Sequence, residues 1–125
     1  MYKLFKYKSY LEKKGNLIPI SFSKNLGFKV KRVFLISGKK KLIRGNHAHK
    51  KCIQSFVQLI GSSKIEIQNK KQKKIFTLDS KKKWGLTVFV RNWVKIEFKS
   101  KENLVLVLCS HDYDKKDYIN DFKKL

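Results

Sequence analysis

The segment Arg44–Lys50, which reads Arg-Gly-Asn-His-Ala-His-Lys, concentrates more reactive side chains than any other part of the chain. A single residue, Ala48, separates His47 from His49. In an extended strand both imidazoles therefore project from the same face, about 7 Å apart along the backbone. An unperturbed imidazole titrates near neutral pH, so this pair can take up and return protons. With a further ligand it can instead hold a metal ion. The spacing therefore predicts a site on one wall of a strand, with either chemistry open.

The elements around this segment predict an all-β domain. Short runs alternate apolar and polar residues and are rich in β-branched side chains, whereas helical periodicity is scarce. The predicted strands are Leu17–Ile20, Val30–Ile36, Ile53–Ile60, Lys64–Gln68, Lys74–Leu78, Leu86–Val90, Val94–Phe98 and Leu104–Cys109. This spacing is typical of a jelly-roll sandwich or small barrel, and it predicts a single domain over residues 1–125. Tyr113–Ile119 is expected to form a short helix or turn that packs on the body.

Length and cysteine usage favour a cytoplasmic protein. The chain has 125 residues and is 42% hydrophobic, which is enough to bury a core. Cys52 and Cys109 lie in apolar runs without the spacing of a disulfide scaffold, so we expect reduced thiols. Met1–Lys6 alternates apolar and basic residues instead of forming a signal peptide, and the apolar run Leu104–Cys109 is too short to span a bilayer.

The net charge of +22 raises the question of nucleic-acid binding. Of the 31 basic residues, however, only Arg32, Arg44 and Arg91 are arginines, and the lysine runs fall at predicted turns. Lysine is a strongly hydrated point charge, whereas proteins that read bases usually use the arginine fork. The charge thus favours a solvated surface that attracts anionic ligands, and no nucleic-acid partner is expected. A basic β-protein that binds nucleic acid remains the alternative.

The histidine segment is similar to the first motif of the cupin superfamily, HxHxxxxExxxxxxG. His47, His49 and Gly61 match it, and Gln54 stands where the family has a carboxylate ligand. A neutral amide is a poorer ligand for a divalent metal. The second cupin motif usually supplies a further histidine, but Val90–Lys95 has none. The pattern therefore favours a cupin without a metal or other cofactor, in which the imidazoles carry out acid-base chemistry.

Further motifs along nearly the whole chain narrow this resemblance to one family. They are Lys31–Phe34, Arg44–Lys50, Gly61-Ser62, Leu78-Asp79, Gly85-Leu86 and Tyr113–Ile119. In this order they resemble the dTDP-4-oxo-6-deoxyglucose 3,4-ketoisomerases, the WxcM-like cupins. The resemblance implies an isomerase that moves a carbonyl from C4 to C3 of a dTDP-linked 6-deoxyhexose, in the biosynthesis of amino-dideoxy sugars for surface polysaccharide. By position His47 matches the catalytic base, and His49 matches a second histidine that relays protons.

The remaining candidate residues would bind the substrate. Arg44 and Arg32 are expected to meet the diphosphate, because guanidinium forks match phosphate oxygens. Trp93 matches a family tryptophan that lies against the sugar or the nucleotide, although a plain core aromatic fits equally well. The set is completed by Asn46, Lys50 and Gln54, of which Gln54 has the alternative of a hydrogen bond within the barrel. Two positions depart from the family, since Phe34 replaces a usual tyrosine and Val94 replaces a frequent histidine.

The sequence also predicts how the chain assembles and leaves one alternative function open. A small β-sandwich has edge strands that need covering, and Tyr2–Tyr10 is a candidate for exchange between the subunits of the homodimer that the family implies. The alternative function is a cupin that binds a nucleotide sugar without catalysis. The configuration of the product at C4 stays open, and Lys14 is a basic residue that could influence it.

Overall fold

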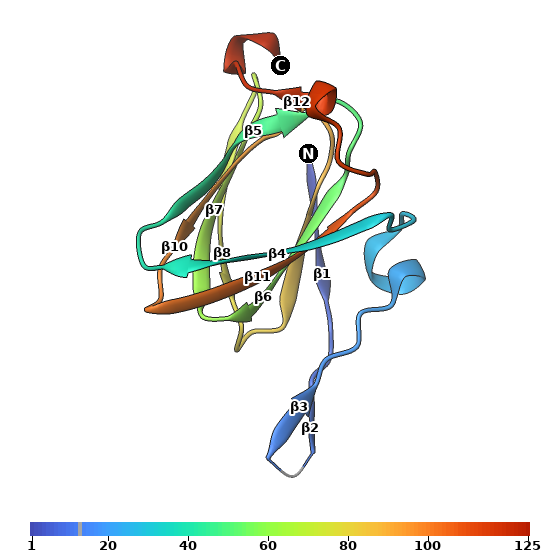
Figure 1. Ribbon diagram of the computed structural model, residues 1–125, viewed down its shortest axis with the longest axis vertical. Coiled ribbons are helices and arrows are strands. Elements are labelled where there is room, and N and C mark those ends of the chain that lie inside the picture. Colours follow the sequence, from blue (N-terminus) through green and yellow to red (C-terminus); the bar gives the residue numbers. More distant parts are fainter. Residues whose placement is uncertain (13) are drawn as a thin grey trace.

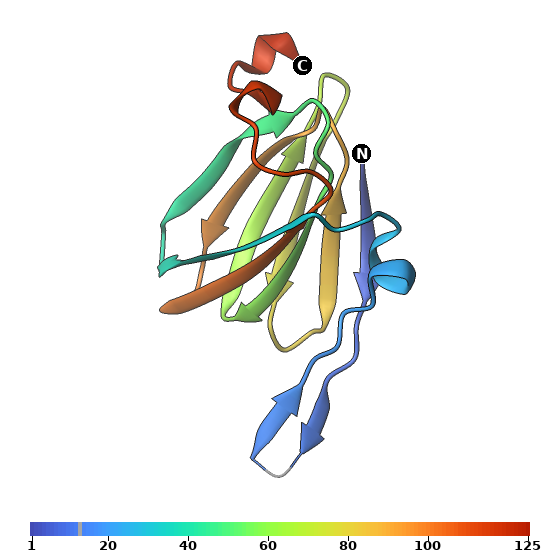
Figure 2. The same cartoon turned by 45° about the vertical axis from the view of Figure 1, so that its right-hand side comes forward.

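Two antiparallel five-stranded sheets face each other and make up most of the protein (Figures 1 and 2). The computed structural model describes residues 1–12 and 14–125. The first sheet has the order β1-β9-β6-β11-β4, with bounds Tyr2–Lys6, Trp84–Val88, Gln54–Ile60, Glu102–Cys109 and Arg32–Lys39. The second has the order β12-β5-β10-β7-β8, with bounds Tyr118–Ile119, Ile43–His49, Trp93–Phe98, Ser62–Gln68 and Lys73–Asp79. This two-sheet arrangement confirms the predicted all-β jelly roll.

The core lies between the two sheets because alternate residues of each strand are apolar and face inward. In β7 and β10, and in β11 as far as Val107, buried positions alternate with more exposed ones, as the period of a strand requires. Ile65, Ile96, Phe98 and Val105 are among the fully buried side chains of this cluster. The inward faces therefore supply a rigid frame for the polar groups at one end of the sandwich.

The N-terminal region departs from the prediction. Strands β2 (Tyr10–Glu12) and β3 (Gly15–Leu17) form a hairpin that projects from the sheets, as Figures 1 and 2 show. The predicted strand Leu17–Ile20 was wrong beyond Leu17. Pro19 has no backbone N–H to donate to a ladder, and the chain here turns back toward the first sheet.

Residues 18–30 then cover part of the outer face of the first sheet. They include the short π-helix η1 (Phe22–Leu26), and Leu26 packs with Phe5, Val57 and Leu108 in a second apolar cluster. Beyond this cover, Val33 and Leu35 of β4 are more than half exposed. The outer face of the first sheet is therefore apolar both where it is covered and where it is not.

Strand β5, which carries the histidine segment, contains a β-bulge at Gly45 and Asn46. Both residues have positive φ, +85° and +65°, and the register against β10 shifts at this point. In a regular strand Arg44 and His47 would face opposite sides, but the extra residue places both on the inner face. Glycine is required at position 45, since a Cβ there would lie 2.8 Å from the carbonyl oxygen of Val94. The bulge thus gathers the reactive side chains of β5 on one wall.

The C-terminal segment closes the end of the sandwich beside β5. It consists of the 3-10 helix η2 (Lys115–Asp117), strand β12 and the 3-10 helix η3 (Phe122–Lys124). Strand β12 pairs Tyr118 with His49 and Ile119 with Ala48. The predicted short helix or turn at Tyr113–Ile119 is therefore confirmed. No helix within residues 1–12 and 14–125 has the length and apolar character needed to cross a membrane.

Candidate active site

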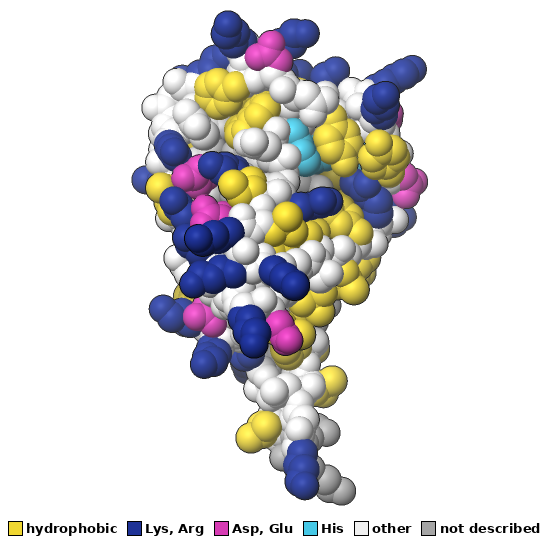
Figure 3. Space-filling view, turned by 60° about the vertical axis from the view of Figure 1, so that its left-hand side comes forward, with side chains coloured by type: hydrophobic (Ala, Val, Ile, Leu, Met, Phe, Trp, Pro, Cys, Tyr) yellow, Lys and Arg dark blue, Asp and Glu magenta, His cyan; other side chains and the backbone are white. Residues whose placement is uncertain are grey.

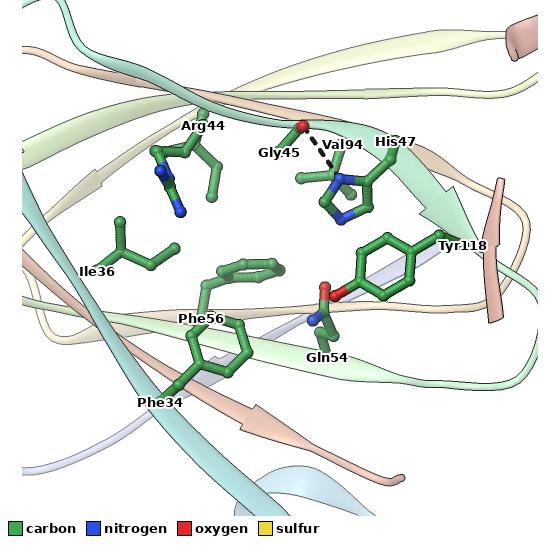
Figure 4. A pocket seen from close by; sticks show the side chains of 10 residues that line it. Phe34, Ile36, Arg44, Gly45, His47, Gln54, Phe56, Val94 and Tyr118 are labelled. Carbon is green, nitrogen blue, oxygen red and sulfur yellow. Dashed lines mark hydrogen bonds between the residues drawn. The ribbon is translucent and has the colours of Figure 1, made fainter. Parts of the chain in front are cut away.

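A cavity of about 120 Å³ opens between the two sheets at the end closed by β12. Its lining comprises Phe34, Ile36, Arg44, Gly45, His47, Gln54, Phe56, Val94, Ile96 and Tyr118. Figure 4 shows Arg44 and His47 on one wall, with the aromatic rings of Phe34 and Phe56 on the opposite wall. From outside, a histidine side chain is visible in a hollow among hydrophobic groups, and Lys and Arg side chains crowd the lower part of this face (Figure 3). The cavity thus combines an apolar floor with a basic wall.

His47 is held as a base by its own backbone. Its Nδ1 lies 3.0 Å from the carbonyl oxygen of Gly45, and a carbonyl can only accept, so Nδ1 carries the proton and Nε2 is free to take one. Burial lowers the pKa of His47, and His49 and Arg44 nearby lower it further. The ring therefore stays neutral at neutral pH, which is the state a general base needs.

His49 lies behind His47 and is almost fully buried, with 5% of its surface exposed. The two ring centroids are 5.0 Å apart with the rings nearly perpendicular. Nδ1 of His49 lies 2.8 Å from Oδ2 of Asp117, and Nε2 is buried without a hydrogen-bond partner. His49 does not line the cavity itself, but its ring contacts the ring of His47, which does.

Asp117 is a residue of the candidate site that the sequence reasoning did not name. Burial raises the pKa of its carboxyl, but the hydrogen bonds from His49 and from the Lys51 amide outweigh this, so the pKa lies below its ordinary value. The ionised carboxylate accepts the proton on Nδ1 and so fixes the tautomer of His49. The aspartate belongs to the motif Tyr113–Ile119, which was noted only as a family resemblance.

Tyr118 is a second residue that was not assigned a role. Its ring lies 4.8 Å from the His47 ring and 4.6 Å from the His49 ring, measured between centroids. Its hydroxyl points toward the amide of Gln54 in the cavity (Figure 4). The tyrosine therefore packs against both imidazoles and offers the cavity a group that can donate or accept a proton.

Gln54 and the two predicted arginines have different places. The amide nitrogen of Gln54 donates to the sulfur of Cys109 at 3.6 Å, so Gln54 makes a hydrogen bond inside the barrel and also lines the cavity. The guanidinium of Arg44 projects into the cavity (Figure 4). The guanidinium carbon of Arg32 lies 5.4 Å from the ring centroid of Phe34, which lines the cavity, and 5.7 Å from that of Tyr113. Both arginines are thus near the cavity, one inside and one at its edge.

None of the three remaining predicted binding residues, Asn46, Trp93 and Lys50, is among those that line the cavity. The bulge residue Asn46 accepts a hydrogen bond from the indole nitrogen of Trp93 at 3.2 Å. Lys50 is exposed and lines a separate surface hollow beside η3. Lys14 lies in the turn of the β2–β3 hairpin, which projects away from the cavity of its own chain (Figure 1).

With this geometry in place, comparison with known proteins identifies the family. The family described as FdtA, WxcM-like, C-terminal, matches residues 1–125. The chain is 36% identical over 126 residues to the TDP-4-oxo-6-deoxy-alpha-D-glucose-3,4-oxoisomerase of Aneurinibacillus thermoaerophilus, covering 98% of this chain and 90% of that one. The protein therefore belongs to the WxcM-like family, as its motifs predicted.

Solved structures agree with this assignment. A histidine-to-asparagine variant of the 3,4-ketoisomerase QdtA from Thermoanaerobacterium thermosaccharolyticum, in complex with TDP-4-keto-6-deoxyglucose, superposes with a TM-score of 0.89. It is 32% identical, and the match covers 98% of this chain and 89% of that one. The 3,5-epimerase RmlC of Legionella pneumophila matches 94% of this chain and 70% of that one at 13% identity and a TM-score of 0.81, which shows a shared fold. The predicted cupin fold and isomerase class are confirmed.

Proposed function

We propose that this protein converts a TDP-linked 4-oxo-6-deoxyhexose into the 3-oxo isomer, with His47 as the base. The observation that carries this proposal is the pair of imidazoles, each with its Nδ1 proton held by a fixed acceptor: the Gly45 carbonyl for His47 and Asp117 for His49. Both Nε2 atoms are then available to accept protons. The reaction would supply precursors of amino-dideoxy sugars for surface polysaccharide such as O-antigen.

The chemistry needs only proton transfers. The C4 carbonyl acidifies the hydrogen on C3, and His47 removes it, so that the C–H electron pair forms a C3–C4 double bond and the charge moves to O4. Loss of the proton from the C3 hydroxyl then makes the new carbonyl, and C4 takes up a proton. His49 relays protons between the two sugar oxygens, and it does so through the hydroxyl of Tyr118, since Tyr118 lines the cavity and packs on the His49 ring. Electrons are conserved within the substrate, and the enediolate is the intermediate.

The two arginines proposed to bind the substrate lie inside the cavity and at its edge. The guanidinium of Arg44 projects inside and faces the anionic intermediate or the diphosphate, and Arg32 offers a second fixed positive charge at the edge. Trp93 alternates with Val94, which lines the cavity, so its indole lies on the outer side of β10, where Asn46 accepts its hydrogen bond, and it is not assigned a contact with the sugar. Thymidine is favoured as the nucleoside, because the relatives named above act on or bind TDP-sugars. Lys50 is assigned only a general electrostatic attraction, since it lies outside the cavity.

Proton NMR of the purified protein with TDP-4-oxo-6-deoxyglucose tests this proposal. We expect the signals of a 3-oxo sugar, and the couplings at C4 will report the configuration of the hydroxyl group there. Tight binding without product, while an active relative works under the same conditions, would replace the isomerase with a cupin that only binds nucleotide sugars. Phe34 favours the alternative of binding without catalysis. It lines the cavity with a phenyl ring, at a position where the family resemblance implies a tyrosine hydroxyl.

The active form is proposed to be a cytoplasmic homodimer of single-domain subunits. Val33 and Leu35 leave an apolar surface on β4, and such surfaces often mark an interface with another chain. Within the single chain β1 pairs with β9, and an exchange would give the same pairing between subunits. The two buried free cysteines favour a reducing compartment. No nucleic-acid partner is proposed, because two of the three arginines, Arg32 and Arg44, lie at a small-molecule cavity.

A further inference from the structure

A second cluster of reactive side chains lies behind His49, outside the sugar cavity. It comprises His49, Cys52 and Asp117, whose potential ligand atoms all lie within 4.8 Å of one another. The three residues are buried, with 5%, 2% and 8% of their surfaces exposed. The catalytic scheme uses the tautomer that Asp117 sets but leaves the Cys52 thiol without a role. The cluster is therefore a candidate for a second site, separate from the sugar cavity.

Backbone contacts hold the two segments of this cluster together. The Lys50 amide donates to the carbonyl oxygen of Asp117 at 2.9 Å, and the Lys51 amide donates to its Oδ1 at 2.6 Å. Strand β12 then pairs Tyr118 with His49. Because the loop after β5 and helix η2 are fixed to each other in this way, the imidazole, thiol and carboxylate are brought together by the fold and not by chance rotamers.

We propose that Zn²⁺ binds to His49, Cys52 and Asp117 and, on the basis of the proposed function, inhibits the isomerase when it does so. Thiolate, imidazole and carboxylate form a ligand set that suits Zn²⁺ and not Mg²⁺ or Ca²⁺. Tetrahedral Zn²⁺ holds such ligand atoms about 3.5 Å apart, so Nδ1 of His49 and Oδ2 of Asp117, now 2.8 Å apart, have to separate slightly, while the wider distances within the 4.8 Å cluster shorten by about 1 Å. The two anionic ligands neutralise the ion, and a water molecule takes the fourth position.

The surface offers a path to this site that does not pass through the sugar cavity. A separate hollow is lined by Asp117 together with Asp112 and Asp114, although the chain has only nine acidic residues in total. Lys31 and Lys51 border the same hollow and moderate its charge. In a protein of net charge +22, these three carboxylates are a local environment that attracts a cation.

Inhibition follows from the proton on the His49 ring. Nδ1 now carries a proton and donates it to Asp117. Coordination of Zn²⁺ through Nδ1 displaces that proton to Nε2, so the ring can no longer accept one there. The Cys52 thiol releases its proton to solvent when it becomes a thiolate ligand. Substrate and metal lie on different sides of His49, so we expect Zn²⁺ to lower the maximal rate while substrate still binds.

Titration with Co²⁺ in the absence of substrate tests the site directly. Co²⁺ bound to a thiolate gives a charge-transfer band in the near ultraviolet, and we expect this band in the natural protein and its loss on addition of Zn²⁺. The Cys52→Ser variant should lose the band. The matched control is Cys109→Ser, which removes the neighbouring buried thiol and should keep the band. Circular dichroism checks the fold of both, and Cys52→Ala repeats the test if the serine variant unfolds.

The outcomes separate this proposal from the proposed function. Absence of the band in the natural protein, or its persistence in Cys52→Ser, overturns the site. If the band behaves as expected, turnover with and without Zn²⁺ and a chelator tests inhibition. Cys52→Ser should keep its activity and resist Zn²⁺, and equal inhibition of both proteins overturns the inhibitory role. Because the Co²⁺ band requires no sugar, it is informative even if the protein proves inactive on the proposed substrate.

Discussion

The two sheets of the protein have inner faces that share one core but outer faces of opposite character. The second sheet, which contains β5, β10 and β7, carries charged residues outward: Glu66 there lies within 4.0 Å of Lys64, Lys73 and Lys95. The first sheet is apolar outward, where Val33 and Leu35 remain exposed beside the cover formed by residues 18–30.

We propose that this difference separates chemistry, on the inner faces, from assembly, on the outer face of the first sheet. The sheet with the solvated outer face donates Arg44 and His47 to the cavity and carries His49 behind them, whereas the sheet with the apolar outer face donates mainly the floor, Phe34 and Phe56. Exposed ion pairs contribute little to stability, so the lysine-rich face is free to vary. Changes on the inner face of the second sheet should therefore act on turnover, and changes on the outer face of the first should act on association.

The largest effect is expected from His47→Asn. Asparagine can occupy the same space but cannot accept the C3 proton, and a positioned general base accounts for about 10²- to 10⁴-fold of a rate. We expect kcat to fall by a factor in this range while the affinity for TDP, measured by calorimetry, is kept. Turnover close to that of the natural protein would remove His47 from the role of base.

Asp117→Asn is expected to have the next largest effect. The variant keeps the shape of the side chain but removes the negative charge that holds the Nδ1 proton of His49. A hydrogen bond to a charged group contributes about 1.5–3 kcal/mol, so we expect kcat to fall about 10- to 100-fold with little change in KM. Steady-state kinetics provide the measurement. A change confined to KM would show that Asp117 acts in binding instead.

Arg44→Ala and Lys95→Ala compare the two faces of the same sheet. Arg44 projects into the cavity, whereas Lys95 lies on the outer face of the adjacent strand and pairs weakly with Glu66. We expect the arginine variant to raise KM about tenfold, through loss of a charged contact with the anionic substrate. The lysine variant should match the natural protein. Equal losses in both variants would mean that overall positive charge, and not the cavity, attracts the substrate.

The pH profile should report the lowered pKa of His47. Only the neutral ring can act as a base, so kcat/KM should fall as the pH drops through that pKa. Because burial lowers the pKa, the acidic limb should lie below the ordinary imidazole value of about 6.5. Rates measured across the acidic range in buffers of constant ionic strength provide the test. A limb above that value would contradict the described environment of His47.

The smallest effect on chemistry is expected from Leu35→Lys. The leucine is 59% exposed on the apolar outer face, so the change should be tolerated by the subunit itself. At the proposed dimer interface, however, a buried lysine would be unpaired and costly. We expect sedimentation to show a shift toward monomer. An unchanged dimer would place the interface on another surface, and a monomeric natural protein would remove the proposed dimer.

The sequence predicted the strands and the histidine wall well because both depend on local patterns. Alternation placed the core strands, and the one-residue spacing of His47 and His49 placed both rings on the inner face. The contact between His49 and Asp117 was missed because the two residues are 68 positions apart and only the pairing of β5 with β12 joins them. Lys50 likewise lies outside the cavity, beside the C-terminal residues Asn120, Asp121 and Lys124. No local sequence pattern predicts that contact.

Deuterium exchange at C3 of the substrate is the most direct test of the central claim, that His47 removes this hydrogen. The natural protein and His47→Asn are incubated with TDP-4-oxo-6-deoxyglucose in heavy water, and proton NMR follows the C3 signal. We predict that the natural protein exchanges this hydrogen and forms the 3-oxo sugar, and that the variant binds the substrate without exchange. Exchange at the same rate in both proteins would contradict the account, because another group would then be the base.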